Sequence, residues 1–396
     1  MANAVNRQEL LPKLLAAFDF AQQQVRALLE RSPGLVPTYT VVGKWNRSSE
    51  PADAWCQGFL PSMMWMFFRQ TGDAFWAKHA EAATRRLEER RFDVEAHDLG
   101  FLFTNTWQRW WRQSGDPKHL DVVVQAGRTL AKRWQPKGEY LASEYNRNSL
   151  LIDLMMNVDL VFFAAKATGD ADLHDIARRH CRTTHRYLVR EDGSTAQEGL
   201  FDPASGRFLR ESNRQGVKPG STFARGLAWA IYGFGTAYHL SHDDEFLVTA
   251  EECAGFYLDR AEAGMMVPWD FNCPPGPKKI VDSSAAAIAA NGFLNLAGLT
   301  KWPENRARYV QAALTILDTL CSPTFLARGK PGQEGVLLHG VYDMPRGVGV
   351  DESLIWGDHY FVEAIYKIIS EKKRKPKSNP GVRRPAAALP AEDVEE

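Results

Sequence analysis

The strongest constraint on the fold is a repeat in which two consecutive helices are joined by a short turn. The turn reads Thr71-Gly72-Asp73 at its first occurrence, and serine or threonine followed by glycine and aspartate returns at residues 114–116 and 168–170. Looser versions occupy residues 241–244 and 297–300. Glycine readily ends one helix and aspartate caps the next, so each turn predicts a boundary between two helices.

The two helices of each repeat differ in polarity. The first, such as residues 223–238, is apolar nearly all round, which is typical of a helix buried on every side. Its partner at residues 243–259 has Leu247, Ala250 and Ala254 on one face and acidic residues on another. We therefore expect inner helices that line an axis and outer helices that face water.

These repeats predict one all-α domain, an (α/α) six-hairpin barrel, over residues 1–370. The last inner helix would pair with an N-terminal helix over residues 8–31. Strand signals are weak and limited to short pieces, such as a hairpin around residues 203–206. Inner helices should begin near six positions: Trp55, Asp98, Leu150, Thr222, Asp282 and Glu352.

The C-terminal segment differs in composition from the rest of the chain. Residues 371–396 are basic, then rich in proline and alanine, then acidic. Such a segment cannot bury enough apolar surface to fold. It predicts a disordered tail, to which we assign no role.

Charge and cysteine content restrict the possible partners. Lysine plus arginine equals aspartate plus glutamate at 48 each, so no global field marks nucleic acid or an anionic membrane as a partner. Five scattered cysteines without C-x-x-C spacing favour thiols in a reducing compartment over a zinc site. Charges interrupt the N-terminus where a secretory signal needs an apolar run, and no stretch could span a bilayer. We expect a cytoplasmic protein, a monomer or a weak homo-oligomer.

Two aspartates are candidates for acid–base chemistry. Asp153 and Asn157 are four residues apart in the apolar run 150–165, where burial would raise the pKa of a carboxylic acid. An aspartate bonded to a neighbouring helix N-terminus is an equal alternative. Asp98 precedes another apolar helix and could be an ordinary N-cap, although Phe101 stands where a capping box needs Glu or Gln. If both acids lie at corresponding ends of adjacent inner helices, they meet in the central cavity and can serve as acid and base.

A second group of residues could hold a sugar. Arg225 and Trp229 are one helical turn apart, and Gln215 precedes them. Arginine can bind a carboxylate or hydroxyls through paired donors, and tryptophan offers a ring face. A structural ion pair together with a core aromatic residue is an equally good explanation. The phosphate loop, the dinucleotide-binding glycine pattern, G-x-S-x-G and H-E-x-x-H are all absent from the sequence.

A series of motifs resembles the unsaturated glucuronyl hydrolases of glycoside hydrolase family 88. The motifs run in the family's order over about residues 40–370: WCQGFLPSMMW from residue 55, HDLGF from 97, LLIDLMMN from 150, REDGS from 190, FDPASG from 201, RQG from 214, ARGLAWAIYGF from 224, DSSAAAI from 282 and DESLIWGDHYFVEA from 351. The resemblance implies the (α/α) six-hairpin barrel and removal of the terminal unsaturated uronic acid from lyase-generated oligosaccharides. It implies no metal or organic cofactor.

The resemblance also implies roles for particular residues. Asp153 would be the general acid and base that hydrates the double bond, and Asp98 would orient the substrate and keep the proton on its neighbour. Ser353 would lie near the substrate carboxylate. The remaining expected substrate contacts are Trp55, His97, Gln197, Arg214, Gln215, Arg225 and Trp229.

The chain departs from the family pattern at three places. Gln197 stands where the family often has histidine, and the segment before the second aspartate lacks the family's usual tryptophan, for which Tyr145 could substitute. Arg214 stands where some members have histidine; it could favour a sulfated or more acidic sugar, or be a salt-bridged surface residue. Two alternatives stay open: an unsaturated rhamnogalacturonyl hydrolase and a non-catalytic sugar-binding barrel.

Overall fold

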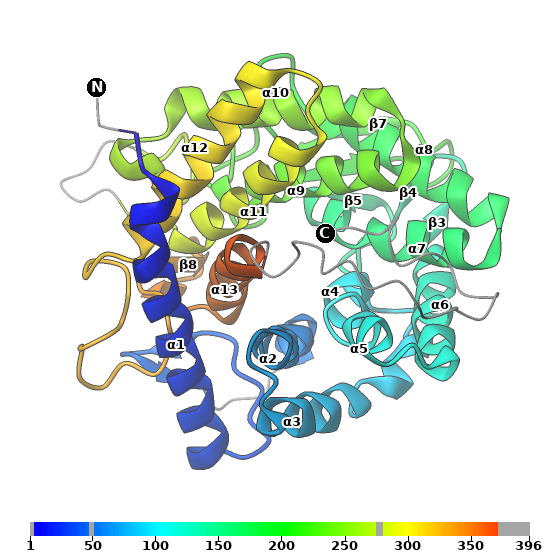
Figure 1. Ribbon diagram of the computed structural model, residues 1–396. Coiled ribbons are helices and arrows are strands. Elements are labelled where there is room, and N and C mark those ends of the chain that lie inside the picture. Colours follow the sequence, from blue (N-terminus) through cyan, green and yellow to red (C-terminus); the bar gives the residue numbers. More distant parts are fainter. Residues whose placement is uncertain (1–3, 47–50, 275–279, 371–396) are drawn as a thin grey trace.

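The computed structural model describes residues 4–46, 51–274 and 280–370, which form a closed ring of helical hairpins (Figure 1). Inner helices surround the axis and outer helices enclose them, as the repeat predicts. The inner helices are α2 (Phe59–Thr71), α4 (Leu99–Phe103) continued by α5 (Trp107–Ser114), α7 (Val158–Thr168), α9 (Ala224–Ser241), α11 (Ser283–Leu299) and α13 (Ile355–Ser370). The outer helices are α1 (Arg7–Arg31), α3 (Ala74–Arg85), α6 (Pro117–Ala131), α8 (Ala171–Leu188), α10 (Asp244–Arg260) and α12 (Pro303–Leu320).

The turns have the geometry that their residues predict. Gly72 ends α2 in the left-handed conformation, with φ of 76°, and the Asp73 side chain accepts a hydrogen bond from the Phe75 amide at the start of α3. The same pair of caps recurs at Gly115 with Asp116 and at Gly169 with Asp170. These three turns account for the alternation between inner and outer helices in the first half of the ring.

Packing around the axis confirms the difference in polarity. Helix α11 buries every residue from Ser283 to Phe293, and α9, α11 and α13 pack side by side. Helix α13 also contacts α1, which closes the ring between the two ends of the described chain (Figure 1). Each outer helix reverses the chain, so the inner helices share one direction and their first turns gather at one end of the barrel.

Short strands and 3₁₀ turns cover the end where the inner helices begin. The expected hairpin around residues 203–206 is present as β6 and β7, which pair antiparallel. The other strands were not predicted. The strands are β1 (Thr40–Val41), β2 (Lys44–Trp45), β3 (Trp134–Gln135), β4 (Tyr140–Leu141), β5 (Ser149–Leu151), β6 (Glu198–Phe201), β7 (Phe208–Ser212), β8 (Gly340–Asp343) and β9 (Val348–Glu352), and the 3₁₀ turns are η1 (Pro51–Gly58), η2 (Glu88–Phe92), η3 (Ile152–Met156) and η4 (Ala263–Met265).

The second inner helix begins directly after Asp98, as expected, and is interrupted between α4 and α5. One expectation about an individual segment needs correction. The apolar run 150–165 is not one helix, because Leu150 and Leu151 belong to β5 and Asp153 lies in η3, before α7 begins. The tail 371–396 lies outside the described residues. Among the residues that are described, no helix combines the length and apolarity needed to cross a membrane.

Candidate active site

A cavity of about 320 Å³ opens where the inner helices begin, and both candidate aspartates line it. Its walls come from the start of the inner helices, from η3, and from loops between β4 and β5 and between β7 and α9. The lining residues are Tyr39, Trp55, His97, Asp98, Phe101, Tyr145, Leu151, Asp153, Gln197, Arg214, Gln215, Arg225, Trp229, Tyr342, Asp343, Arg346 and Val348. The cavity therefore combines carboxylates, arginines and aromatic rings in one space of sugar size.

Asp98 occupies the N-cap position of α4, but its side chain makes no capping hydrogen bond. One carboxylate oxygen instead accepts from Asn157 Nδ2 at 2.9 Å, and the other lies 3.4 Å from His97 Nε2. Burial raises the pKa of Asp98 to about 7; His97 opposes the rise, and the nearby carboxylates of Glu144 and Asp153 add to it. The carboxylate thus belongs to the cavity and not to the helix end, which excludes the ordinary N-cap as its main role.

Asp153 is held at the cavity wall by η3. Its Oδ1 is buried, and no hydrogen-bond partner for it exists among the described residues. Burial raises the pKa of Asp153, while the positive charge of Arg225 and the imidazole of His97 limit the rise. A carboxylic acid in this environment keeps its proton to higher pH than a free aspartate does, which suits a general acid.

Asn157 connects the two acids. Its side-chain amide donates to Asp98 and, at 3.3 Å, to the backbone oxygen of Asp153, while its Oδ1 accepts from the Phe101 amide at 3.0 Å. Gly100 permits this approach, because a Cβ there would lie 2.5 Å from the Asn157 Cα. Asp153 and Asn157 therefore interact, but not across one turn of an α-helix as expected. The asparagine amide instead orients the two segments that carry Asp98 and Asp153.

Aromatic rings form one wall of the cavity. The rings of Phe101 and Trp356 pack against the half-buried Trp55 at tilted angles, and its indole nitrogen lies 3.4 Å from the Tyr342 hydroxyl. Trp229 is only 1% exposed and packs against Phe101. Trp55 can therefore offer a ring face to a sugar, whereas Trp229 mainly supports the wall behind it.

Gln197, Arg214 and Gln215 form a small network at the rim. Gln197 Oε1 accepts from the backbone amides of Arg214 and Gln215, and its Nε2 donates to Gln215 Oε1 at 2.8 Å. The Arg214 guanidinium lies 3.9 Å from the centre of the Tyr145 ring. Gln197 therefore shapes the loop that presents Arg214, in addition to lining the cavity.

Two expected substrate contacts are placed differently. The Arg225 guanidinium donates to the backbone oxygens of Val341 and Tyr342 at 2.6 and 2.9 Å, so much of its donor capacity ties β8 to α9. Its side chain still lines the cavity beside Asp153. Ser353 is 1% exposed and is absent from the cavity lining. The backbone of Ser353 pairs with Thr40, and this pairing positions β9 against the N-terminal segment. A contact between Ser353 and the substrate is not supported.

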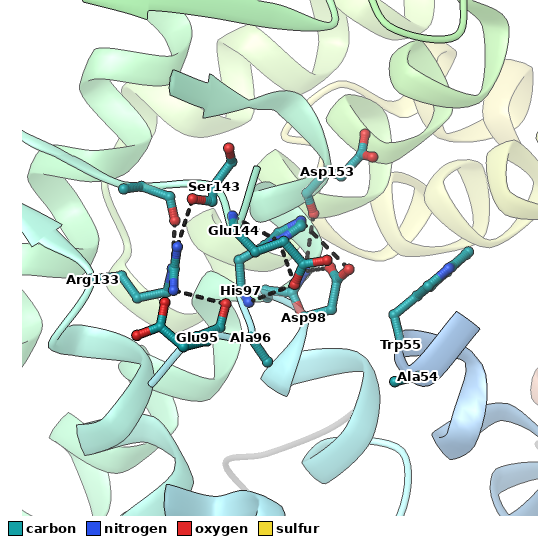
Figure 2. A network of polar contacts seen from close by, with 12 residues as sticks. Ala54, Trp55, Glu95, Ala96, His97, Asp98, Arg133, Ser143, Glu144 and Asp153 are labelled. Carbon is teal, nitrogen blue, oxygen red and sulfur yellow. Dashed lines mark hydrogen bonds and ion pairs between the residues drawn. The ribbon is translucent and has the colours of Figure 1, made fainter. Parts of the chain in front are cut away.

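Several lining residues were missed from the sequence. Tyr342, Asp343, Arg346 and Val348 come from the β8–β9 hairpin. Glu144 was also missed: its carboxylate lies 3.1 Å from His97 Nδ1 (Figure 2). The sequence carries little sign of these residues, because their loops reach the cavity only in the folded chain.

Comparison with known proteins gives the family. No protein-family model matches the chain. An unsaturated glucuronyl hydrolase from Bacillus sp. GL1 is 32% identical over 328 residues, which cover 79% of this chain and 86% of that protein. A solved structure of the enzyme from that source has a TM-score of 0.84 and 28% identity, covering 90% of this chain and 96% of that one.

A streptococcal relative points to the same family. An unsaturated chondroitin disaccharide hydrolase from Streptococcus agalactiae is 32% identical over 333 residues, covering 80% of this chain and 82% of that protein. A solved structure of an unsaturated glucuronyl hydrolase variant from this organism, complexed with dGlcA-GalNAc6S, has a TM-score of 0.80 and 26% identity, covering 93% and 94% of the two chains. The barrel and the acid-lined cavity define a glycoside hydrolase. The chain belongs to the unsaturated glucuronyl hydrolases, glycoside hydrolase family 88.

Proposed function

We propose that this enzyme removes the terminal 4,5-unsaturated uronic acid from lyase-generated oligosaccharides by hydrating the vinyl ether double bond, with Asp153 as general acid and base. The observation that carries the proposal is the placement of Asp98 and Asp153 in one cavity, connected through Asn157. The relatives' activity on unsaturated glucuronyl and chondroitin disaccharides supports the substrate class.

The proposed reaction begins with proton transfer. Protonated Asp153 gives its proton to carbon 4, which leaves an oxocarbenium-like cation at carbon 5. Asp153, now a carboxylate, takes a proton from water while the water oxygen bonds to carbon 5. The hemiketal that results opens and releases the next sugar. Because this hydration changes no net oxidation state and returns Asp153 to its protonated form, the proposed steps require neither a metal nor an organic cofactor.

Asp98 has a different task in this scheme. Two buried carboxylates in one cavity do not both ionise readily, so the pair holds one proton over a wide pH range. Asn157 donates a hydrogen bond to Asp98, and the charge of His97 lies 3.4 Å from the same carboxylate; both favour the ionised form of Asp98 and leave the proton with Asp153. The negative charge of Asp98 then also stabilises the developing cation.

The organisation of the chain is part of the proposal. Residues 1–370 constitute the catalytic domain, and the tail 371–396 receives no role. The five cysteines form no disulfide, which fits a reducing compartment such as the cytoplasm. The partner is the unsaturated oligosaccharide itself, and a monomer or weak homo-oligomer suffices because every proposed catalytic group comes from one chain.

A panel of lyase-generated disaccharides tests the proposal. Hydration removes the conjugated double bond, so the expected result is a loss of ultraviolet absorbance with unsaturated glucuronyl and chondroitin disaccharides. Preference for unsaturated galacturonyl-rhamnose would instead support the rhamnogalacturonyl alternative. Tight binding of every substrate without any loss of absorbance would show a non-catalytic sugar-binding barrel.

A further inference from the structure

One acidic residue beside the cavity has no role in the scheme above. Glu144, in the loop after β4, places its carboxylate 3.1 Å from His97 Nδ1, and His97 Nε2 lies 3.4 Å from the Asp98 carboxylate (Figure 2). The imidazole is 2% exposed, so each of its nitrogens lies near a carboxylate with little access to water. Two carboxylates this close stabilise the imidazole as a cation.

We propose that Glu144 is a positioning residue of this active site: it keeps His97 protonated, and the imidazolium holds Asp98 in its ionised form so that the shared proton stays on Asp153. The inference rests on the proposed function, since it assigns the acid role to Asp153. Glu144 acts through His97 and does not itself line the cavity.

The local hydrogen bonds make His97 sensitive to this one carboxylate. The Glu144 backbone N–H donates to His97 Nδ1 at 3.3 Å, and the Glu144 carboxylate lies 3.1 Å from the same nitrogen, so the two contacts compete for it. An ionised carboxylate favours a proton on Nδ1, which then donates to the carboxylate in place of accepting the backbone N–H. Without that charge, Nδ1 keeps the backbone N–H as its donor, which leaves a neutral imidazole. Glu144 therefore determines whether His97 is protonated or neutral, with almost no change in the positions of the two residues.

The carboxylates around His97 favour the cation. Burial alone would lower the pKa of His97, but the carboxylates of Asp98, Glu144 and Asp153 outweigh it and raise the pKa. Burial would likewise raise the pKa of Glu144, but the hydrogen bond and charge of His97 lower it. Arg133 also lowers it, and the Tyr145 ring, 5.8 Å from the imidazole, adds no charge. The pair is thus mutually stabilised as an ion pair.

A buried arginine fixes the spacing between the two loops. Arg133 is 1% exposed and belongs to neither loop. Its guanidinium donates to four backbone oxygens at 2.5–2.9 Å, two just before His97 and two just before Glu144 (Figure 2): those of Val94, Glu95, Ala142 and Ser143. These bonds hold the backbone just before His97 and just before Glu144, so they fix how closely the two loops approach each other.

A cation site is the main alternative for the same residues. Donor atoms of His97, Asp98 and Glu144 lie within 4.8 Å of one another. However, the two carboxylates contact different ring nitrogens, Asp98 at Nε2 and Glu144 at Nδ1. A single ion can coordinate only one of these nitrogens, so binding all three residues would abandon one of the two contacts. The geometry favours an ion-paired relay.

The test compares Glu144→Gln with Glu144→Asp and with Glu95→Gln. Glu95 is a matched control, since its carboxylate is 77% exposed, lies in the neighbouring loop and pairs with Arg147 outside the cavity. We expect Glu144→Gln to lower kcat about 10-fold at neutral pH with little change in KM, and to move the alkaline limb of the kcat profile to lower pH. Activity should recover on acidification, because His97 then regains its proton. Glu144→Asp should restore part of the alkaline limb, and Glu95→Gln should change neither quantity.

A second measurement does not depend on turnover. Nitrogen-15 NMR of histidine-labelled protein, with His97 assigned by the loss of its signals in His97→Gln, should show imidazolium in the unaltered enzyme and neutral imidazole in Glu144→Gln at neutral pH. Imidazolium in both proteins, or an unchanged pH profile in Glu144→Gln, overturns the inference. If the unaltered enzyme fails to hydrate any disaccharide while the NMR contrast holds, the proposed function fails and the Glu144–His97 pair stands.

Discussion

Two aspartates only six residues apart, Asp153 and Asp159, face opposite ends of the barrel. Asp153 lines the polar cavity where the inner helices begin, whereas Asp159, in the first turn of α7, lines a second cavity of about 120 Å³ further along the axis. Burial raises the pKa of both, that of Asp159 to about 6. A buried acid with a raised pKa is therefore common to both ends of the molecule.

The surroundings of the two acids differ. Near Asp153 lie a second carboxylate, a cationic imidazole and half-buried aromatic rings. The second cavity contains the Arg109–Glu363 pair at 2.6 Å, in which each charge is already compensated. A buried carboxylic acid with a raised pKa therefore becomes an acid–base catalyst only where other groups converge on the same reacting atom.

The largest expected effect is a loss of turnover, and it is confined to the end of the barrel that holds Asp153. Asp153→Asn should lower kcat by at least about 100-fold, because the general acid is lost, while substrate binding changes little. Asp159→Asn should leave kcat within about twofold, since the second cavity holds no group of the proposed mechanism. Steady-state kinetics with an unsaturated disaccharide measures both. Comparable losses in the two variants would show that burial, and not position, explains the effect of Asp153.

Buried arginines at the two ends provide the next contrast. Arg225→Met leaves the buried Asp282 without the guanidinium 3.8 Å away and should destabilise the fold by about 3 kcal/mol. Arg109→Met breaks the pair with Glu363 and should have a similar effect in thermal denaturation. Only Arg225→Met should alter the pH profile: the charge of Arg225 holds the pKa of Asp153 down, so without it Asp153 stays protonated, and the enzyme active, to higher pH. An unshifted profile would show that Arg225 is purely structural.

A smaller effect is expected at the end of the barrel that holds Asp159, where it concerns how the stability of the protein depends on pH. Burial raises the pKa of Asp159 to about 6, so between roughly pH 4 and pH 6 the folded state keeps a proton that the unfolded chain has lost. This group therefore makes the protein less stable as pH rises through that window. Asp159→Asn cannot ionise and should gain about 2 kcal/mol relative to the unaltered protein between pH 4 and pH 8 in urea denaturation, once solvent access to the half-buried side chain is allowed for. A constant difference across that range would contradict the assignment.

The same comparison shows what local sequence can predict. The glycine and aspartate caps, such as Gly72 and Asp73, act on neighbouring residues, so the hairpins and the ring could be inferred from them. Asp98 and Asp153 could be paired because each was expected near the start of a consecutive inner helix. The 3₁₀ turn around Asp153 could not be predicted, because a buried strand or 3₁₀ turn has the same apolar sequence as a buried helix.

Contacts across the chain account for what the sequence did not reveal. Glu144 reaches His97 across 47 positions, and Arg225 reaches the Val341 oxygen across 116. Neither relation has a periodic signature, since the partners meet only once the ring closes. Ser353 illustrates the converse: it lies in a matching motif, yet its backbone pairs with Thr40 and its side chain does not line the cavity.

The smallest expected effect concerns the rim and the identity of the sugar after the scissile bond. The Arg214 guanidinium packs 3.9 Å from the Tyr145 ring and remains partly exposed, so a contact with a sulfate or carboxylate there is worth about 1 kcal/mol and weakens in salt. Arg214→Gln should therefore raise KM about fivefold for a sulfated disaccharide, leave kcat unchanged and have no effect on an unsulfated one. Arg112→Gln, in the opposite cavity, is the matched loss of charge and should change neither substrate's KM. Equal KM changes for both substrates in Arg214→Gln would mean that Arg214 supports the loop and does not choose the sugar.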